Sequence, residues 1–287
     1  MSRLYKRKAR VTVWEPKADT FFSDVSATNA IVITDLRVTF EIERTGSKHP
    51  DTCKATITNA SEDTRAVFHR KPVLVRLEAG YDDDIRTLFT GDLLFSASKL
   101  DKTDWVTTFQ IADGLRSFRE GRVAQSFKEG ATVLDALKAA AKALQFSIPS
   151  NILNDATMQS QFAAGLTLHG PAEKQLTNLL TPYGYNWSIQ NNRLVILKQS
   201  DTQPGDAIVV DENTGLIGSP ETGAPTKDQK IPVTTIKMLL NDRVLPGTKI
   251  QLTSRDHNKV LMKVVKLTMT GDTHGGDFQS TVEAKPL

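Results

Sequence analysis

A six-residue pattern that occurs twice constrains the fold of this chain more than any other feature. The copies are residues 104–109 (DWVTTF) and 277–282 (DFQSTV), and both read Asp, aromatic, any residue, Ser or Thr, Thr, apolar. A polar turn and two strand-like runs precede each copy, at 73–77 and 91–95 in one case and at 249–252 and 264–267 in the other. Because the same strand order surrounds both copies, the sequence predicts a duplicated β module that ends in an antiparallel meander.

Alternating apolar and polar residues mark further strands around this pattern. Residues 36–43 alternate in this way, and residues 53–58 return with the same alternation after a turn. A period of two buries one face of a strand and leaves the other in solvent, as in antiparallel sheets. The C-terminal part carries strand signals at 207–210, 233–240, 244–252, 260–268 and 278–284. Short strands separated by turn signals are typical of a barrel or a sandwich.

The pattern changes in the middle of the chain. Thr132 and Asp135 have the spacing of a capping box at the start of a helix. The helix that follows has an apolar face formed by Leu134, Leu137, Ala141 and Leu144. A second helix is predicted after Pro171, and a hairpin over 185–197. The chain therefore divides into a β-domain at 1–117, an α/β insert at 118–200 and a second β-domain at 201–287, an α+β fold that is mainly β.

Charge and cysteine content limit the class of protein. The formal net charge is +3, from 36 basic and 33 acidic side chains, which gives no general argument for nucleic-acid binding. Cys53 is the single cysteine, so an intramolecular disulfide is excluded and a reducing compartment fits. Residues 1–16 lack an apolar signal-peptide core, and no apolar run reaches the roughly 20 residues of a membrane span. We expect a soluble protein that is made in a cytoplasm.

The sequence offers no constellation of catalytic or metal-binding residues. The five histidines lack metal-ligand spacing, and P-loop, dinucleotide-binding and nucleophile-elbow motifs are absent. His274 and Asp277 bracket two glycines, which is more simply a turn, although a surface metal stays open as an alternative. Three adjacent acids, Asp82 to Asp84, lack the alternating spacers of a calcium loop, so a solvated loop is favoured over a partner contact or a metal. We predict a protein that is not an enzyme, with no catalytic residues, no metal and no cofactor.

Taken together, these segments resemble the baseplate hub proteins of contractile phage tails, the late control or tail protein D family. The resemblance covers nearly the full length and rests on LRVTFEI (36–42), ATITN (55–59), LEAGY (77–81), FTGDL (89–93), GLIGSP (215–220), LL (239–240), LPG (245–247) and GD (271–272). The larger family members carry an appended cell-wall hydrolase or spike domain. The sequence ends at Leu287 without one, which puts a fused lytic activity in doubt.

The resemblance implies a structural role. Hubs of this family are homotrimers in which each subunit gives two tube-like β-barrels, so that three chains adapt a sixfold tail tube to a threefold spike. The implied partners are other copies of the chain, the tail tube protein, the central spike protein and other baseplate proteins, with DNA only as cargo passing through the lumen. The implied location is the virion tail baseplate, after assembly in the host cytoplasm. Loops expected to contact neighbouring subunits contain Tyr81, Asp82, Asp83, Asp84, Gly271 and Asp272.

Two alternatives stay open at this point. A cell-wall-degrading enzyme of the same tail would need a pair of carboxylates, and none stands out in the sequence. A peptidoglycan-binding module is suggested by Tyr183, Tyr185 and Trp187 in the insert, although packing of these aromatic residues inside the insert is favoured. The basic start, Tyr5 to Arg10, is interpreted as a solvated tail or as an arm that docks on an acidic neighbour.

Overall fold

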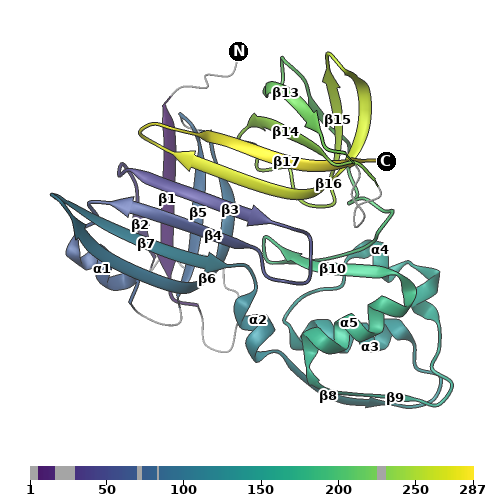
Figure 1. Ribbon diagram of the computed structural model, residues 1–287. Coiled ribbons are helices and arrows are strands. Elements are labelled where there is room, and N and C mark those ends of the chain that lie inside the picture. The colour runs from purple at the N-terminus through teal and green to yellow at the C-terminus, as the bar shows by residue number, and fades with distance from the viewer. Residues whose placement is uncertain (1–5, 17–29, 70–72, 83, 225–230) are drawn as a thin grey trace.

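Antiparallel strands dominate the computed structural model, which describes residues 6–16, 30–69, 73–82, 84–224 and 231–287. Within these ranges, 13 strands join in one sheet, and two smaller sheets of two strands belong to the insert. The sheet folds back on itself, so that β5 and β1 lie behind β3 and β4 (Figure 1). Below the sheet in the same view lies the α/β insert.

Module 1 contains the first seven strands and one short helix. Its strands are β1 (Arg7–Trp14), β2 (Ile31–Ile33), β3 (Val38–Arg44), β4 (Thr52–Thr58), β5 (Leu74–Tyr81), β6 (Asp84–Asp101) and β7 (Asp104–Ala112). In β3 every second residue is buried, as the alternation predicts. Helix α1 (Glu62–Val67) begins after Ser61, whose hydroxyl accepts a hydrogen bond from the Thr64 N–H.

Module 2 contains the last six strands. They are β12 (Ile208–Val210), β13 (Leu216–Thr222), β14 (Thr234–Leu239), β15 (Lys249–Ser254), β16 (His257–Asp272) and β17 (Phe278–Pro286). β15, β16 and β17 form an antiparallel meander, as do β5, β6 and β7 in module 1. The two predicted meanders are therefore confirmed.

The two modules repeat one strand order. Module 1 runs β3-β4-β7-β6-β5-β1, and module 2 runs β13-β14-β17-β16-β15-β12. Neighbours in both orders are antiparallel except at the end of module 2, where β12 pairs with β15 in parallel while β1 pairs with β5 antiparallel. Five of the six strands in each module thus share order and direction.

Irregularities in strand pairing also repeat. The β6–β7 register shifts between Leu93 and Phe95, and the β16–β17 register shifts between Val264 and Lys266. A second shift follows Leu77 in the β5–β6 pair and Leu252 in the β15–β16 pair. Because bulges are placed features of a sheet, their repetition at equivalent positions supports a duplicated module more strongly than strand order alone.

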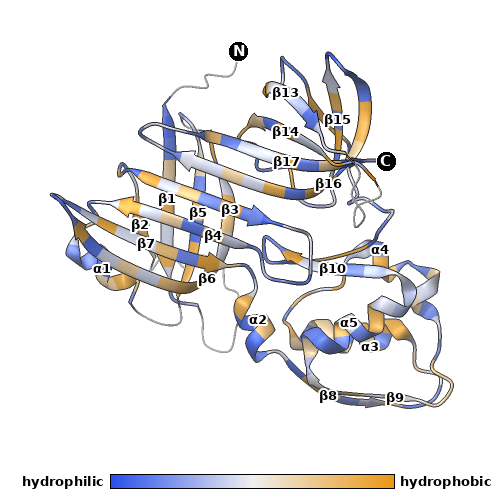
Figure 2. Ribbon diagram, in the orientation of Figure 1, coloured by the Kyte–Doolittle hydropathy of each residue, from blue (hydrophilic) through white to orange (hydrophobic). Residues whose placement is uncertain are grey.

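The insert has its own core between the modules. Its elements are α2 (Leu115–Glu120), β8 (Arg122–Phe127), α3 (Val133–Ala143), α4 (Ser150–Leu153), η1 (Ala156–Gln159), β9 (Leu166–Pro171), α5 (Ala172–Leu180), η2 (Thr181–Tyr183), β10 (Tyr185–Gln190) and β11 (Arg193–Lys198). The predicted capping box at Thr132 and Asp135 is confirmed at the start of α3. Buried apolar residues of α3, α5 and β10 belong to one cluster, and Figure 2 shows hydrophobic segments on both helices.

The modules share one sheet and one core. Residues 267–272 of β16 pair antiparallel with residues 39–44 of β3, and one buried apolar cluster extends through both modules. The predicted fold class, α+β and mainly β, is confirmed, while the strands form one continuous sheet instead of two separately closed ones. Domain boundaries at 117 and 200 stay a prediction, with α2 beginning slightly earlier, at Leu115.

The basic start of the chain differs from the favoured expectation. From Arg7 onward it is strand β1, hydrogen-bonded along its length to β5, and not a solvated tail. Arg7 donates to the carbonyl of Gly276 at 2.8 Å and its guanidinium lies 5.3 Å from the centre of the Phe278 ring. Because its backbone groups are hydrogen-bonded to a neighbouring strand, this segment is not a mobile tail. The alternation of apolar and polar residues in it is too short for a strand to be predicted from the sequence.

Candidate subunit interface

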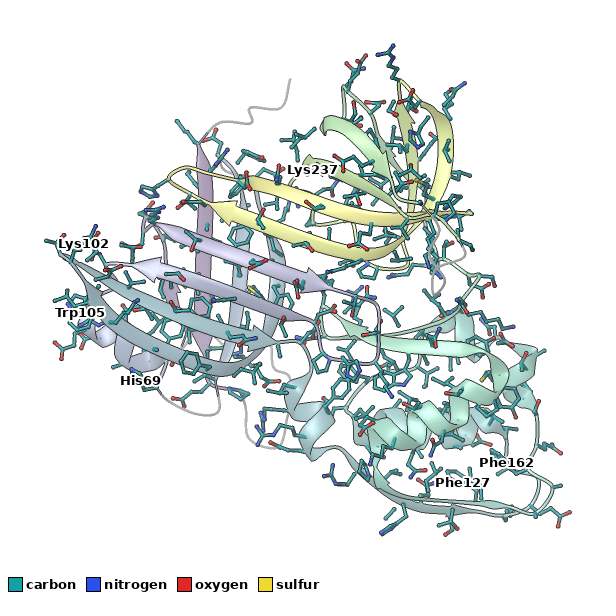
Figure 3. All side chains as sticks on the ribbon, viewed as in Figure 1. His69, Lys102, Trp105, Phe127, Phe162 and Lys237 are labelled. Carbon is teal, nitrogen blue, oxygen red and sulfur yellow. The ribbon has the colours of Figure 1, made fainter. Side chains whose placement is uncertain are left out.

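Strand β6 has a long open edge. Its first half pairs with β5 and residues 92–101 pair with β7 on the opposite side, so the edge of residues 94–101 that faces away from β7 has no strand partner among the described residues. On this half, Phe95 is 56% exposed and Leu100 is 58% exposed. Trp105 and Lys102 lie at the free end of the same hairpin (Figure 3). An open edge that carries large apolar side chains is a template for pairing with another chain.

Strand β13 has the second open edge. It pairs with β14 on one side only, within the described part of the chain. Its pairing is interrupted between Ile217 and Glu221, where Gly218, Ser219 and Pro220 bulge out. Pro220 has no N–H to donate, and proline in a sheet is confined to edges and bulges. β13 and β6 stand at opposite ends of the series β13-β14-β17-β16-β3-β4-β7-β6.

The junction between the modules shows how such edges meet inside the chain. The Phe40 ring of β3 lies over Gly271 of β16, where an added Cβ would come within 2.2 Å of the ring. Beside it, Ile42 is opposite Met269 in the buried core, and on the exposed face Lys266 lies 4.0 Å from Glu43. Close backbone approach, apolar packing and an ion pair therefore combine at this junction.

The β16–β17 hairpin tip is held on module 1. Asp272 accepts two hydrogen bonds from Arg37, at 3.2 and 2.7 Å, and the pKa of this carboxyl is lowered mainly by its bond with Arg37. Phe278 is 4% exposed and packs edge-on against both Phe40 and Tyr81. At the equivalent hairpin tip of module 1, Trp105 is 39% exposed, and the Arg65 guanidinium lies 4.1 Å from the centre of its ring.

A buried polar cluster ties the insert to module 1. Arg44 donates to the carbonyl of Leu88 at 2.7 Å and to Asn191 Oδ1, at the tip of the insert hairpin, at 2.6 Å. Its Nη1 lies 3.8 Å from Asp51, and Asp113 accepts from the Asn192 N–H at 3.2 Å. Burial raises the pKa of Asp51 and of Asp113 to about 6. The cluster is buried, and its hydrogen bonds join the insert hairpin to module 1.

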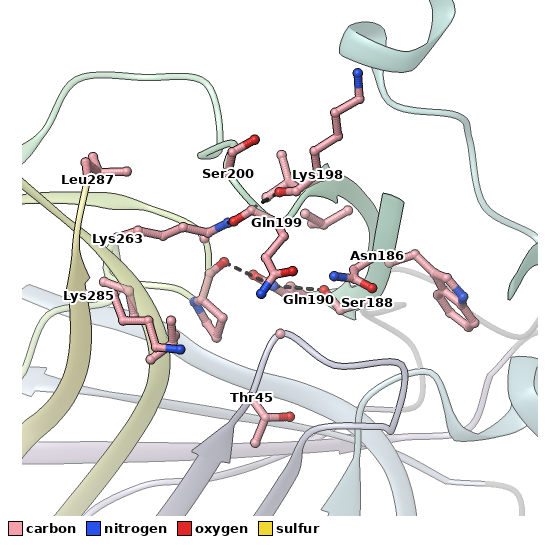
Figure 4. Close-up of a pocket in the computed structure, with 18 of the residues that line it drawn as sticks. Thr45, Asn186, Ser188, Gln190, Lys198, Gln199, Ser200, Lys263, Lys285 and Leu287 are labelled. Carbon is pink, nitrogen blue, oxygen red and sulfur yellow. Dashed lines mark hydrogen bonds between the residues drawn. The ribbon is translucent and has the colours of Figure 1, made fainter. Parts of the chain in front are cut away.

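A cavity of about 410 Å³ lies between the insert hairpin, the β3–β4 turn and β16 (Figure 4). Lys263 extends into this region and donates to the Gln199 carbonyl at 3.0 Å, and burial lowers its pKa. Lysines 198, 263 and 285 are the ionisable side chains among its described lining residues. No carboxylate or imidazole side chain is among these described lining residues.

The aromatic residues of the insert are packed inside it. Tyr185 and Trp187 are both buried, Trp187 stacks on Phe118 with ring centres 5.4 Å apart, and its indole N–H donates to Thr177 at 3.0 Å. Tyr185 hydrogen-bonds Asp155. The favoured prediction of internal packing is confirmed for Tyr185 and Trp187, and Tyr183 is half-buried against the same core. A stacking platform for sugar rings is not formed by Tyr185 and Trp187.

Neither a metal cluster nor a membrane-spanning helix is found in the described ranges. No group of three or more His, Cys, Asp or Glu side chains there converges on a point that could hold a metal ion. The described helices are all too short or too polar to cross a bilayer. His274 lies in a turn, where its N–H donates to Asp272 Oδ1 at 2.9 Å.

Comparison with solved structures identifies the fold. A 43 kDa tail protein of prophage MuSo2 from Shewanella oneidensis matches with a TM-score of 0.60 and 8% identity over 96% of this chain and 98% of its own. A tail protein from Neisseria meningitidis MC58 matches with a TM-score of 0.60 and 13% identity over 98% and 97%. This chain has the fold of phage tail proteins.

The same fold extends to a secretion machine. The E. coli c3393 protein, a component of the type VI secretion system with structural similarity to the T4 tail proteins gp27 and gp5, matches with a TM-score of 0.58 and 12% identity over 88% of this chain and 74% of its own. No protein-family model and no curated protein matches the sequence. At such low identity, the tail-protein fold is conserved in backbone arrangement alone.

The structure brings part of the predicted contact set together, but inside the chain. Gly271 and Asp272 end strand β16 at the module junction, and Tyr81 reaches the same place, where its hydroxyl donates to the carbonyl of Phe278, the residue opposite Gly271, at 3.4 Å. Asp84 is exposed and pairs with Arg86 at 2.6 Å, and the Asp82 N–H donates to the Lys6 carbonyl at 2.9 Å. Asp83 lies outside the described residues. A role for these loops between subunits stays a prediction.

Sequence reasoning missed the open edges of the tail-protein fold. Phe95, Lys99 and Leu100 on β6, and Glu221 on β13, were not singled out, because pairing partners of a strand are set by tertiary structure. One signal was present in the sequence, because the repeated pattern places Trp105 where the other copy has Phe278. In the structure Phe278 is buried and Trp105 is exposed, so the two hairpin tips have unequal surroundings.

Proposed function

We propose that this chain is a structural, non-enzymatic baseplate hub of a contractile phage tail. Three copies form a pseudo-hexameric ring that adapts a sixfold tail tube to a threefold spike and leaves a channel for DNA. The observation that carries the proposal is the pair of equivalent β modules joined in one sheet that is open at both ends. The fold shared with phage tail proteins supports it.

Duplication inside one chain suits a symmetry adaptor. Two modules of the same strand order present two similar surfaces per chain, so three chains present six. The single insert per chain is present only three times, and it lies at one end of the modules (Figure 1). The module surfaces then suit a sixfold partner such as the tail tube protein, while features present three times suit the central spike and other baseplate proteins.

The exposed face of the sheet suits a channel that DNA passes without binding. It is rich in threonine, from residues Thr39, Thr56, Thr108, Thr268, Thr270 and Thr281. Two lysines on this face have acidic neighbours on the adjoining strand: Lys54 is opposite Glu41, and Lys266 is opposite Glu283. Lys237 on the same face is opposite Thr281 and has no acid beside it. Because binding to the phosphate backbone depends on unpaired Lys and Arg, the two pairings weaken the attraction of this face for DNA.

The assembly state tests this proposal. Native mass spectrometry of the purified chain, alone and mixed with the tube and spike proteins of the same phage, should detect a species of three times the 31.6 kDa chain mass. A particle that stays monomeric with both partners present would contradict the hub. Assembly in the host cytoplasm and location in the virion baseplate follow from the same role and are checked by probing purified virions for the chain.

A further inference from the structure

The two open edges occupy equivalent positions to the two strands that meet inside the chain. β13 is the module 2 equivalent of β3, and β6 is the module 1 equivalent of β16. Inside the chain, β3 pairs with the second half of β16, on the side that faces away from β17. On β6 the same half and the same side are open, and on β13 the edge facing away from β14 is open.

We infer that the open edge of β13 pairs antiparallel with the second half of β6 in a neighbouring copy of this chain, with Glu221 opposite Lys99. The inference rests on the proposed ring and adds to it the strands, the direction and the register of the contact between subunits. Within one chain β13 and β6 are not paired and lie on opposite sides of the molecule (Figure 1), so the contact is assigned to a neighbouring copy.

The register follows from equivalent residues. Lys99 is opposite Val106 and Thr270 is opposite Gln279, which places Lys99 and Thr270 at the same position of the repeat. Glu41 is opposite Thr270 across the junction inside the chain.

The other partner of the contact is placed in the same way. Glu41 is opposite Lys54, and Glu221 is opposite Thr235. Lys54 and Thr235 occupy equivalent positions of the repeat, because their partners on β7 and β17, Gln110 and Glu283, are equivalent. Glu221 therefore takes the position of Glu41, and its partner in the next copy is Lys99.

Charges at this register are complementary. Lys99 and Glu221 are both exposed, and both project from the face of the sheet that points away from the buried core. The ion pair of Lys266 with Glu43, which lies diagonally across the junction inside the chain, shows that the same face accommodates opposite charges on the two strands. Directly opposed charges of opposite sign stabilise a strand pair.

Side-chain volumes are complementary as well. Leu100 takes the position of Gly271, and the bulge that contains Gly218 takes the position of Phe40. Inside the chain a large β3 residue covers a glycine on β16. Between chains the sizes are reversed, with a large β6 residue facing a glycine on β13. A Cβ added at Gly218 would meet nothing within 4 Å, so space for the Leu100 side chain is present.

The remaining open edges of the sheet are less suited to this contact. β2 and β12 at the other edges of the sheet are three residues each, and short edge strands are a common protection against pairing. The β6 edge is longer and carries Phe95 and Leu100, both more than half exposed. Pairing would also cover the hairpin tip at Trp105, as module 1 covers the tip at Phe278.

A cysteine pair tests the register. In the double variant Lys99→Cys/Glu221→Cys, directly opposite residues have Cα atoms about 4.5–5.5 Å apart, which a disulfide can span. Mild oxidation should give covalent dimers and closed trimers that revert on reduction. The control pair Ala97→Cys/Glu221→Cys is two residues out of register and should cross-link at least tenfold less. Cys53 is fully buried, so the unmodified chain should not cross-link.

The outcomes separate this inference from the proposed function. A native trimer whose Lys99→Cys/Glu221→Cys variant does not cross-link, or cross-links no better than the control pair, overturns the β13–β6 pairing and leaves the hub standing. Absence of any trimer overturns both.

A charge reversal gives a second, independent measurement. Lys99→Glu should weaken assembly about two- to fivefold per interface, and Glu221→Lys in the same chain should restore it. Equal weakening in the single and the double variant would contradict the pairing.

Discussion

At the scale of the residue, the two modules are unequal where each meets its neighbour. Phe40 and Gly271 fit together inside the chain, whereas the equivalent Leu100 is left exposed. A duplicated fold with identical contacts would have no means of distinguishing its internal junction from its contact with another copy. Differences in side-chain size at equivalent positions therefore give each edge its own partner.

Gly271→Ala should destabilise the folded chain. The new Cβ would lie within 2.2 Å of the Phe40 ring, and overpacking of this kind costs about 1–3 kcal/mol in the free energy of unfolding. Urea denaturation of the separated subunit measures the loss, and Phe40→Leu in the same chain should recover part of it. Leu100→Ala is the matched control, because an exposed side chain at the equivalent position should change subunit stability by less than about 0.5 kcal/mol.

Asp92 should make stability depend on pH. Burial raises the pKa of this carboxyl to about 6, so the folded chain holds the proton more tightly than the unfolded chain does. Its contribution to stability is present below pH 4 and is lost as the pH rises to about 6. Asp92→Asn keeps an acceptor for the Arg116 N–H and removes the titration.

Denaturation at several pH values tests this assignment. The Asp92→Asn variant should gain about 3 kcal/mol over the natural chain at pH 7 and almost nothing at pH 4. Asp84→Asn, at an exposed carboxyl, is the control and should show no such difference. An Asp92→Asn gain that is the same at both pH values would show that the effect is not a titration.

At the scale of the element, strands that bury one face could be predicted and their partners could not. Alternation located β3 and β4, and the repeated pattern located β7 and β17. β8 was missed because four of its six residues are exposed and its apolar signal is weak. Whether an edge of β6 or β13 is open depends on whether another strand pairs with it in the fold. A local sequence pattern does not contain this information.

The insert hairpin depends on one buried cation. Arg44→Ala leaves Asp51 and Asp113 buried without their guanidinium partner, and breaking a buried ion pair typically costs about 3–5 kcal/mol. Amide exchange at Asn191 and Asn192 should accelerate more than exchange in β16. Arg86→Ala, which removes an exposed partner of Asp84, is the control. Uniform acceleration throughout the chain would show global unfolding instead of release of the insert.

At the scale of the whole molecule, each chain is proposed to form two of the six parts of a ring wall. The resemblance to hub proteins predicted the fold that comparison with tail proteins shows, and the strand pairings add the repeat in detail. The number of copies and the symmetry of the assembly cannot be predicted from a single chain. An interface between two unlike edges closes into a ring only if the rotation from one copy to the next is a whole fraction of 360°. The central claim is that three duplicated chains imitate six single ones.

Electron microscopy of the assembled particle tests that claim most directly. End-on averages, computed without imposed symmetry, should show a closed ring of six similar lobes with three insert densities and an open centre. A particle in which the lobes number other than six, or in which the six lobes are not joined into one continuous wall, would contradict the account.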